Sequence, residues 1–277
     1  MKKKLSKALV ELKKKGKSTF AFNLQNFYQL EACVFTASKL KVPVIIQFSE
    51  RFLRFLNDKY SVEYIIRKYK TDYTYFHLDH CIDLDFIKFC IDSGFDSVMY
   101  DGSAFAIDEN IKNTLIIMEY AEKAGCLVEG ELGKVSGVED GFGEEGSSYA
   151  EIMEIIRYVK ETKIDLMALG IGNAHGFYEN LDGIDISILK DASNQLEANQ
   201  LFVLHGGTGL PENVIREAIS LGVVKINIST QLKKETMDLV KKFANNNNKL
   251  YNEISYHDNM MVGLSKLFEN YLHKYTL

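Results

Sequence analysis

The sequence lacks several features that mark common classes of protein. Its four cysteines are scattered and none forms a CxxC pair, so we expect a reduced, cytoplasmic protein with its cysteines in or near the core. No apolar run approaches the roughly 18 residues of a membrane-spanning helix, and we expect no membrane association. The net charge of -5 offers no electrostatic support for nucleic-acid binding.

Basic residues do gather near the start of the chain, at positions 2–4 and 13–15. They are typical of the solvated face of a first helix. A secretory signal peptide is the alternative interpretation. However, the apolar stretch that would form its hydrophobic region is short and is interrupted by Ser6, Lys7 and Glu11.

Only two prolines occur in the chain, and no linker stands out. We therefore expect one domain over residues 1–277, a length that suits an α/β barrel of about 250 residues. Short apolar runs alternate with longer segments of helical periodicity, which predicts strands that are buried on both faces. The predicted strands are Thr19–Phe22, Val44–Phe48, Tyr73–Leu78, Ser97–Tyr100, Leu127–Glu131, Leu166–Leu169, Leu201–Leu204 and Val224–Ile228.

This alternation of strands and helices favours an α/β fold, a closed parallel (β/α)8 TIM barrel. An open doubly wound sheet is the alternative, but it favours a glycine-rich loop after the first strand. Here the residues at 23–26 are Asn-Leu-Gln-Asn. We further predict a short N-terminal helix before the barrel and a C-terminal helical extension after it, interrupted by the asparagine run at 245–248.

Polar residues lie at or just after the ends of the predicted strands. Because the carboxyl ends of all strands of a parallel barrel meet at one rim, where active sites of this fold lie, we expect these side chains to share one site. The rim residues are Asn23, Ser49, Asp79, His80, Asp101, Glu131, His175, His205, Asn227, Ser229 and Thr230.

Three of the rim residues are histidines, His80, His175 and His205. Catalytic zinc takes three protein ligands and keeps a fourth position open, and neutral imidazoles leave the ion its full charge as a Lewis acid. Each histidine alone is more often structural, but the set predicts a zinc site. His77 lies three residues before His80, and residues an odd number apart in a strand face opposite sides. We therefore expect His77 to point away from His80.

Acidic residues accompany the predicted zinc site. Asp79 is suited to move a proton on a metal-bound substrate, or else to orient a histidine. Asp101 and Glu131 would bind a second cation or hold the histidines by hydrogen bonds. The long segment 133–147 is rich in glycine and acid. It is typical of a mobile lid that carries Glu139 toward the site as a second base, and an acidic surface loop is the alternative.

Two segments with accessible backbone N–H groups follow the last two predicted strands. Residues 205–209 are His-Gly-Gly-Thr-Gly, and residues 227–230 are Asn-Ile-Ser-Thr at the start of a predicted helix. Loops at these positions form the usual phosphate site of a (β/α)8 barrel. The sequence therefore indicates a phosphate cradle beside the histidines.

Together these motifs resemble the class II, metal-dependent ketose-bisphosphate aldolases, especially the branch with tagatose- and fructose-bisphosphate aldolases. The resemblance runs from about Ala21 to Thr230. Its motifs are AFN at 21–23, PVIIQFS at 43–49, HLDH at 77–80, SVMYDGS at 97–103, ENIKNT at 109–114, VEGELGKVSGVED at 128–140, AHG at 174–176, HGGTGLP at 205–211 and KINIST at 225–230.

The resemblance implies reversible aldol cleavage of a ketose (bis)phosphate to dihydroxyacetone phosphate and an aldehyde, through a zinc-stabilised enediolate. It implies zinc on His80, His175 and His205, an alternative divalent site at Asp101 and Glu131, and a monovalent cation near the phosphate. Family members are usually homodimers or homotetramers that act on small phosphorylated sugars.

The resemblance also implies roles for individual residues. Asp79 would act as acid and base at the C4 hydroxyl, and Glu139 would handle the proton at C3. The implied substrate-binding residues are Asn23, Ser49, Gly176, Gly206, Gly207, Thr208, Asn227, Ile228, Ser229 and Thr230.

Two departures from the family pattern bear on the substrate. A lysine usually follows the tyrosine after AHG, but here Tyr178 is followed by Glu179. The family usually has an Asp-Pro-Arg element later in the chain, but residues 256–261 contain no arginine. Losing an arginine removes a bidentate phosphate contact, which favours a different aldehyde partner, or a ketose 1-phosphate, over a ketose bisphosphate. A barrel metallohydrolase and a catalytically weakened metal-binding barrel are the alternatives.

Overall fold

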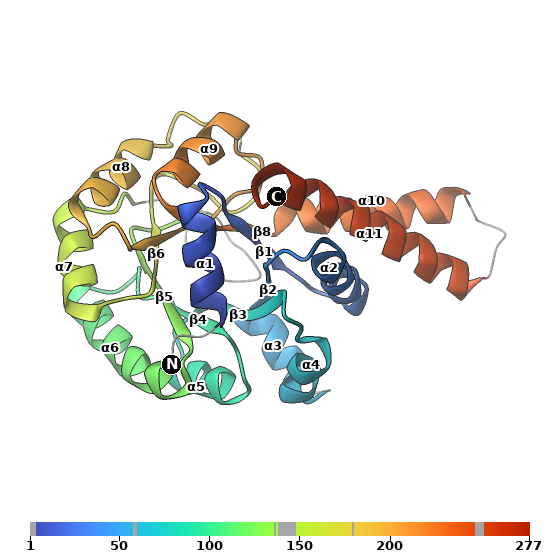
Figure 1. Ribbon diagram of the computed structural model, residues 1–277, viewed down its shortest axis with the longest axis horizontal. Coiled ribbons are helices and arrows are strands. Elements are labelled where there is room, and N and C mark those ends of the chain that lie inside the picture. The colour runs from blue at the N-terminus through green and yellow to red at the C-terminus, as the bar shows by residue number, and fades with distance from the viewer. Residues whose placement is uncertain (1–3, 58–59, 136, 138–147, 179, 247–251) are drawn as a thin grey trace.

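The structure is a computed structural model that describes residues 4–57, 60–135, 137, 148–178, 180–246 and 252–277. Parallel strands close into a barrel in which each strand pairs with the next and the last pairs with the first (Figure 1). The strands are β1 (Thr19–Asn23), β2 (Val44–Ser49), β3 (Thr74–Cys81), β4 (Ser97–Tyr100), β5 (Leu127–Leu132), β6 (Leu166–Leu169), β7 (Leu201–Leu204) and β8 (Val223–Ile228). The predicted (β/α)8 barrel is confirmed, and β3 extends beyond its predicted end.

Helices surround the barrel, with additional helices at both ends of the described chain. Those that follow the strands around the barrel are α2 (Phe27–Leu40), α3 (Glu50–Asn57), α4 (Val62–Tyr69), α5 (Leu84–Asp92), α6 (Ile107–Ala124), α7 (Ile152–Thr162), α8 (Ile186–Gln195) and α9 (Glu212–Ser220). The additional helices are α1 (Lys4–Lys14), α10 (Thr230–Asn246) and α11 (Glu253–Tyr275). None of the described helices is long and apolar enough to cross a membrane.

The amino-terminal half of the barrel interior is apolar. Leu5, Leu9 and Leu12 recur at helical spacing on α1 and are buried. They pack against inward-facing side chains from most of the strands, and Figure 1 shows α1 crossing this end of the barrel. Those strand side chains are Ala21, Ile45, Tyr75, Leu127, Leu166, Ala168, Leu201, Val203 and Val224. The helix therefore closes one end of the barrel, so that a polar site can open only at the other end.

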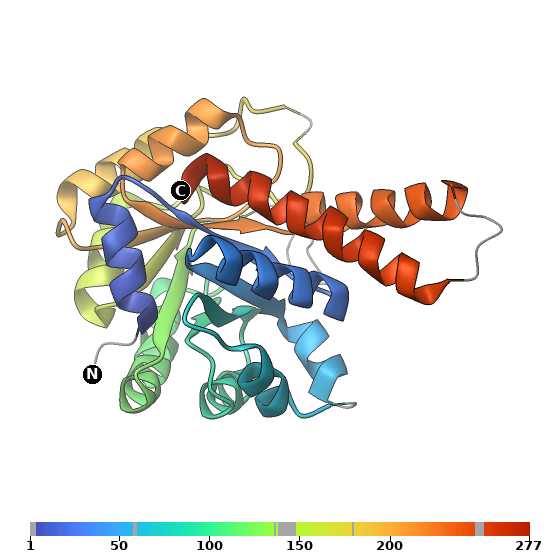
Figure 2. The same cartoon turned by 45° about the vertical axis from the view of Figure 1, so that its right-hand side comes forward.

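The C-terminal helices α10 and α11 lie side by side and extend beyond the barrel (Figures 1 and 2). The later part of α11 returns to the barrel, where the ring of Phe268 contacts Phe22 at 4.8 Å between centroids. Tyr271 contacts Phe20 at 5.2 Å in the same way. The predicted C-terminal helical extension is thus confirmed, and aromatic packing on β1 holds it in place.

Strand β3 contains one extra residue where it reaches the rim. Leu78 pairs with Val98 and Cys81 pairs with Tyr100, so three steps along β3 match two along β4. His80 has a left-handed backbone, with φ of 38°. Such a bulge interrupts the strict alternation of side chains.

The bulge corrects the expectation for His77. His77 contacts Lys225 of β8 across the interior of the barrel. It therefore faces inward, as do Asp79 and His80. The expectation that His77 points away from His80 was wrong because it assumed an unbroken strand.

Candidate active site

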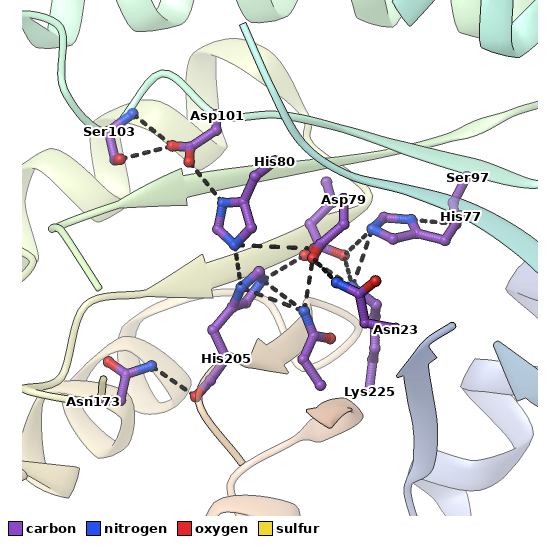
Figure 3. Close-up of polar contacts among 12 residues, drawn as sticks. Asn23, His77, Asp79, His80, Ser97, Asp101, Ser103, Asn173, His205 and Lys225 are labelled. Carbon is purple, nitrogen blue, oxygen red and sulfur yellow. Dashed lines mark hydrogen bonds and ion pairs between the residues drawn. The ribbon is translucent and has the colours of Figure 1, made fainter. Parts of the chain in front are cut away.

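The three predicted zinc ligands converge at the carboxyl-terminal rim. His80 comes from β3, His175 from the loop after β6, and His205 follows β7. One nitrogen from each lies within 4.8 Å of the corresponding nitrogen of the others. Figure 3 shows the rings of His80 and His205 next to each other, with 3.0 Å between Nε2 of His80 and Nδ1 of His205. This spacing suits three nitrogen ligands of one ion.

Asp101 holds His80 from the side away from the other histidines. The Nδ1 atom of His80 lies 2.7 Å from Oδ2 of Asp101, and Ser103 Oγ donates to Oδ1 of the same carboxylate at 2.7 Å. Burial alone would lower the pKa of His80, but Asp79 and Asp101 raise it well above its usual value. Burial would likewise raise the pKa of Asp101, but its hydrogen bond to His80 lowers it.

Glu129 of β5 holds His205 in a corresponding way. The Nε2 atom of His205 lies 2.8 Å from Oε1 of Glu129, and both side chains are completely buried. Burial lowers the pKa of His205 to about 4. Burial would raise the pKa of Glu129, but Lys225 and His77 keep it below its usual range.

Asp79 lies at the centre of the rim and is 2% exposed. Its two carboxylate oxygens are each approached at 3.4 Å by a side-chain amide, from Asn23 of β1 and from Asn227 of β8. Oδ1 also lies 3.9 Å from Nε2 of His80. The carboxylate is therefore held in the barrel mouth beside the histidines, where a bound substrate would meet it.

Glu131 gives the rim a second possible metal site. Oxygen or nitrogen atoms of His80, Asp101 and Glu131 lie within 4.8 Å of one another. Burial and the nearby Asp101 raise the pKa of Glu131 well above its usual value. Its Oε2 atom is buried, with no hydrogen-bond partner among the described residues. A cation would satisfy this oxygen and relieve the repulsion between the two acids.

The glycine loop after β7 lies against the end of β8 and the start of α10. The N–H of Gly207 donates to the carbonyl of Asn227 at 3.1 Å. Thr208 Oγ1 accepts from the N–H of Gln231 in the first turn of α10, at 3.4 Å. Ser229 Oγ is buried and has no partner within the described part of the chain. The N-terminus of α10, which begins at Thr230, thus lies beside the glycine loop.

Several predicted substrate-binding residues have backbone constraints of their own. A Cβ atom on Gly206 would lie 2.3 Å from the carbonyl oxygen of Ala174, so only glycine fits there. Gly176 has φ of 101°, which glycine adopts readily. Ser49 is buried at the end of β2. The side chain of Ile228 packs in the hydrophobic layer outside the strands, so its backbone alone is available to a ligand.

Glu139 and Glu179 lie outside the residues that the structure describes. The described flank of the glycine-rich segment reaches the site, because a Cβ on Gly137 would lie 2.8 Å from the carbonyl oxygen of His175. Beyond His175, Tyr178 Oη accepts from the N–H of Ala174 at 3.0 Å and donates to the carbonyl of Gly206 at 2.8 Å. Tyr178 therefore ties the His175 loop to the His205 loop, a role that the sequence did not reveal.

A second polar layer lies beneath the rim and was also missed. Lys225 contacts Glu129 and His77 inside the barrel. Glu129 stands two residues before Glu131, and Lys225 two before Asn227. Side chains two apart in a strand share a face, so a polar residue two positions before a rim residue is a candidate for the layer below. Applied to the sequence, this rule identifies Glu129 and Lys225.

The described donors fit zinc. Three imidazole nitrogens converge, and Asp101 and Glu129 contact the outer nitrogens of two of the rings. Carboxylates on the outer nitrogens of metal-binding histidines are the usual arrangement. The described donors and the contacts around them are therefore compatible with a bound zinc ion.

The family model for "Fructose-bisphosphate aldolase class-II" matches residues 3–276. The chain belongs to the class II fructose-bisphosphate aldolase family. It is an aldolase, a carbon–carbon lyase, and members of its family are generally zinc-dependent.

Several named aldolases are similar to this chain over most of its length. The 6-phospho-5-dehydro-2-deoxy-D-gluconate aldolase of Bacillus subtilis is 34% identical over 257 residues, covering 91% of this chain and 88% of the relative. A fructose-bisphosphate aldolase of Staphylococcus aureus is 31% identical over 257 residues, covering 91% and 89%. The crystal structure of fructose-bisphosphate aldolase from Campylobacter jejuni has the same fold, with a TM-score of 0.82, 22% identity, and coverage of 98% and 93%.

Proposed function

We propose that this aldolase holds zinc on His80, His175 and His205 and cleaves a ketose phosphate reversibly to dihydroxyacetone phosphate and an aldehyde. The observation that carries the proposal is the convergence of three imidazole nitrogens within 4.8 Å of one another, with Asp79 Oδ1 3.9 Å from His80 Nε2. Bound zinc would supply a Lewis acid for the carbonyl of the ketose. Asp101 and Glu131 would provide an alternative divalent site.

Asp79 is our candidate for the proton of the C4 hydroxyl. In the cleavage direction it would take that proton as the C3–C4 bond breaks, so that C4 becomes the aldehyde carbon and the electron pair goes to C3. The side-chain amides of Asn23 and Asn227 approach the two oxygens of this carboxylate and orient it. Glu139 is the candidate that would then deliver a proton to C3, and the reverse direction would use the same groups in the opposite sense.

The phosphate of the donor would lie between the glycine loop and the start of α10. Gly206, Gly207 and Thr208 offer one side, and the segment of Asn227, Ile228, Ser229 and Thr230 offers the other. The N–H of Gly207 already donates to Asn227, so the other backbone N–H groups of these segments and the positive end of the α10 dipole would hold the anion. The rest of the ketose would contact Gly176, Asn23 and Ser49. A monovalent cation would bind beside the phosphate.

The number of phosphates on the ketose determines which aldehyde is released. We infer a ketose with one phosphate, because residues 256–261 contain no arginine for a second one. In the structure this stretch lies in α11, where the rings of Tyr256 and His257 pack on Tyr28. The Bacillus subtilis relative is named for a substrate with a single phosphate. A small aldehyde without phosphate is therefore the favoured partner.

We also propose that the enzyme works in the cytoplasm as a homodimer or homotetramer, on small phosphorylated sugars. The four cysteines are free, which fits a reducing compartment.

The decisive experiment is a condensation assay with dihydroxyacetone phosphate and a panel of aldehydes, with and without phosphate or carboxylate groups. We expect turnover with at least one unphosphorylated aldehyde, and loss of activity after chelation that zinc restores. Full activity of zinc-free enzyme would refute the metal role. A preference for glyceraldehyde 3-phosphate would refute the single-phosphate substrate.

The same assay separates the rival functions. A metallohydrolase would incorporate solvent oxygen into its product instead of breaking a carbon–carbon bond, which labelled water detects by mass spectrometry. A catalytically weakened barrel would bind zinc and turn over no aldehyde in the panel.

A further inference from the structure

A buried ion pair lies directly beneath the three histidines. Lys225 Nζ is 2.8 Å from Oε2 and 3.1 Å from Oε1 of Glu129. Both side chains are completely buried, and they come from strands β8 and β5 on different sides of the barrel. Figure 3 shows Lys225 below Asn23 and close to His77. Burying a charged pair is costly in free energy unless its geometry is good, and the proton transfers proposed above do not use it.

The contacts of this pair determine where protons lie on His77. An ammonium group only donates hydrogen bonds. Since Lys225 Nζ lies 3.1 Å from Nε2 of His77, that nitrogen must be the acceptor. The proton of a neutral His77 ring then lies on Nδ1, which can donate to Ser97 Oγ at 2.8 Å.

The same reasoning applies to His205. An ionised carboxylate only accepts hydrogen bonds. Lys225 donates to both oxygens of Glu129. His205 Nε2 lies 2.8 Å from Oε1 of Glu129, so this nitrogen carries the proton. The Nδ1 atom of His205 is then left with its lone pair, and it faces His80 Nε2 at 3.0 Å.

We propose that Glu129 and Lys225 are positioning residues that fix His205 in its Nε2–H tautomer and aim its Nδ1 lone pair at the metal. Lys225 anchors the carboxylate from below, so that Oε1 remains directed at His205. Asp101 orients His80 in the opposite sense, since its contact is to Nδ1 and leaves Nε2 for the metal. The inference rests on the proposed three-histidine zinc site.

The first test needs no variant. In the metal-free protein, long-range ¹H–¹⁵N correlation spectra distinguish the two tautomers of each histidine. We expect His205 to carry its proton on Nε2 and His77 to carry its proton on Nδ1. A His205 ring protonated on Nδ1 alone would overturn the proposal, whatever the behaviour of the variants.

The second test is the zinc affinity of Glu129→Gln, measured by competition with a chromogenic chelator. The amide has one oxygen, and we expect it to remain with Lys225, which needs an acceptor. The amide NH2 then faces Nε2 of His205 and favours the Nδ1–H tautomer. We expect zinc affinity to fall about 10- to 100-fold, the usual effect of losing such a partner, with a matching change in the His205 spectrum.

The double variant Glu129→Gln/Lys225→Met sharpens the test. Without the ammonium, the amide oxygen is free to accept from His205, so we expect zinc to bind more tightly than in Glu129→Gln alone. Equal affinity in the two variants would contradict the role of Lys225. Ile45→Val, which removes one methylene from the apolar end of the interior, is the packing control and should leave zinc affinity unchanged.

His205→Ala distinguishes this inference from the proposed function. If His205→Ala loses zinc while a folded Glu129→Gln binds it within about twofold of the parent, the positioning role is wrong and the zinc site stands. If His205→Ala keeps its zinc, the three-histidine site itself is wrong, and the inference fails with it. Circular dichroism melting curves establish that each variant is folded.

Discussion

The two halves of the barrel interior are made of opposite kinds of side chain. The amino-terminal half holds Leu5 and Leu9 from α1 against apolar strand residues such as Ile45. The carboxyl-terminal half holds imidazoles, carboxylates and amides, several with buried atoms that have no partner within the described residues. The apolar half gains free energy from burial, whereas the polar half gives up stability to hold groups ready for a ligand.

The comparison suggests that stability and function are separated along the barrel axis. Substitutions at the apolar end should lower the free energy of unfolding and leave zinc affinity unchanged. Substitutions at the polar end should lower zinc affinity or turnover and leave the free energy of unfolding nearly unchanged. The following variants test this separation, in order of decreasing expected effect.

His205→Ala should have the largest effect on activity. It removes a proposed zinc ligand, and loss of a metal contribution on the order of 5 kcal/mol slows the reaction by on the order of 10³-fold or more. Zinc content, measured by atomic absorption, should fall with it. His273→Ala, at an exposed position on α11, is the control and should retain both zinc and activity. Normal activity in His205→Ala would remove the histidine set from the mechanism.

Asp79→Asn should lower turnover without removing zinc. A positioned acid–base group contributes about 10²- to 10⁴-fold, and the amide keeps the size of the side chain. The measurements are steady-state kinetics and zinc content on the same preparation. The exposed Asp191→Asn serves as the matched control. Should turnover and zinc fall together in Asp79→Asn, Asp79 would instead be a support for the metal site.

Leu9→Ala tests the apolar end. Leu9 is 0% exposed beneath the barrel, and truncating such a residue costs about 2–5 kcal/mol of unfolding free energy. Urea unfolding should detect the loss, and zinc affinity should remain that of the parent. Leu115→Ala, at a 42% exposed position on α6, should change stability by no more than about 0.5 kcal/mol. Weaker zinc binding in folded Leu9→Ala would show that the two ends are coupled.

Tyr178→Phe should have the smallest effect. It removes the hydroxyl that joins the N–H of Ala174 to the carbonyl of Gly206. A neutral hydrogen bond contributes a net of about 0.5–1.5 kcal/mol. Because about 1.4 kcal/mol is tenfold, zinc affinity should fall by about two- to tenfold. The control is Tyr149→Phe, whose hydroxyl bonds to Gly183 at an exposed site. An unchanged affinity in Tyr178→Phe would mean that the two loops hold their positions independently.

The sequence predicted the fold well because parallel strands buried on both faces leave a clear pattern. Apolar runs such as Leu166–Leu169 and Leu201–Leu204 matched their strands residue for residue. The rim was also predictable, since a strand end is easy to locate along the chain. The three histidines therefore appeared as a set before their distances were known.

What the sequence did not reveal depends on contacts between strands. Lys225 in a run of apolar residues gives no sign that its partner is Glu129, nearly a hundred positions earlier in the chain. Tyr178 likewise offers no sign that its hydroxyl joins two loops. The orientation of His77 was mistaken because a bulge adds a residue without leaving a mark in composition.

The bulge in β3 has a consequence for protein engineering. It allows neighbouring residues of one strand, Asp79 and His80, to reach the same pocket. The proposed proton-transfer group and a proposed metal ligand are therefore adjacent in the sequence, and the bulge places them together. Deleting a single residue there would turn one of the two away, so a designer who transplants this chemistry to another barrel must copy the irregular backbone along with the side chains.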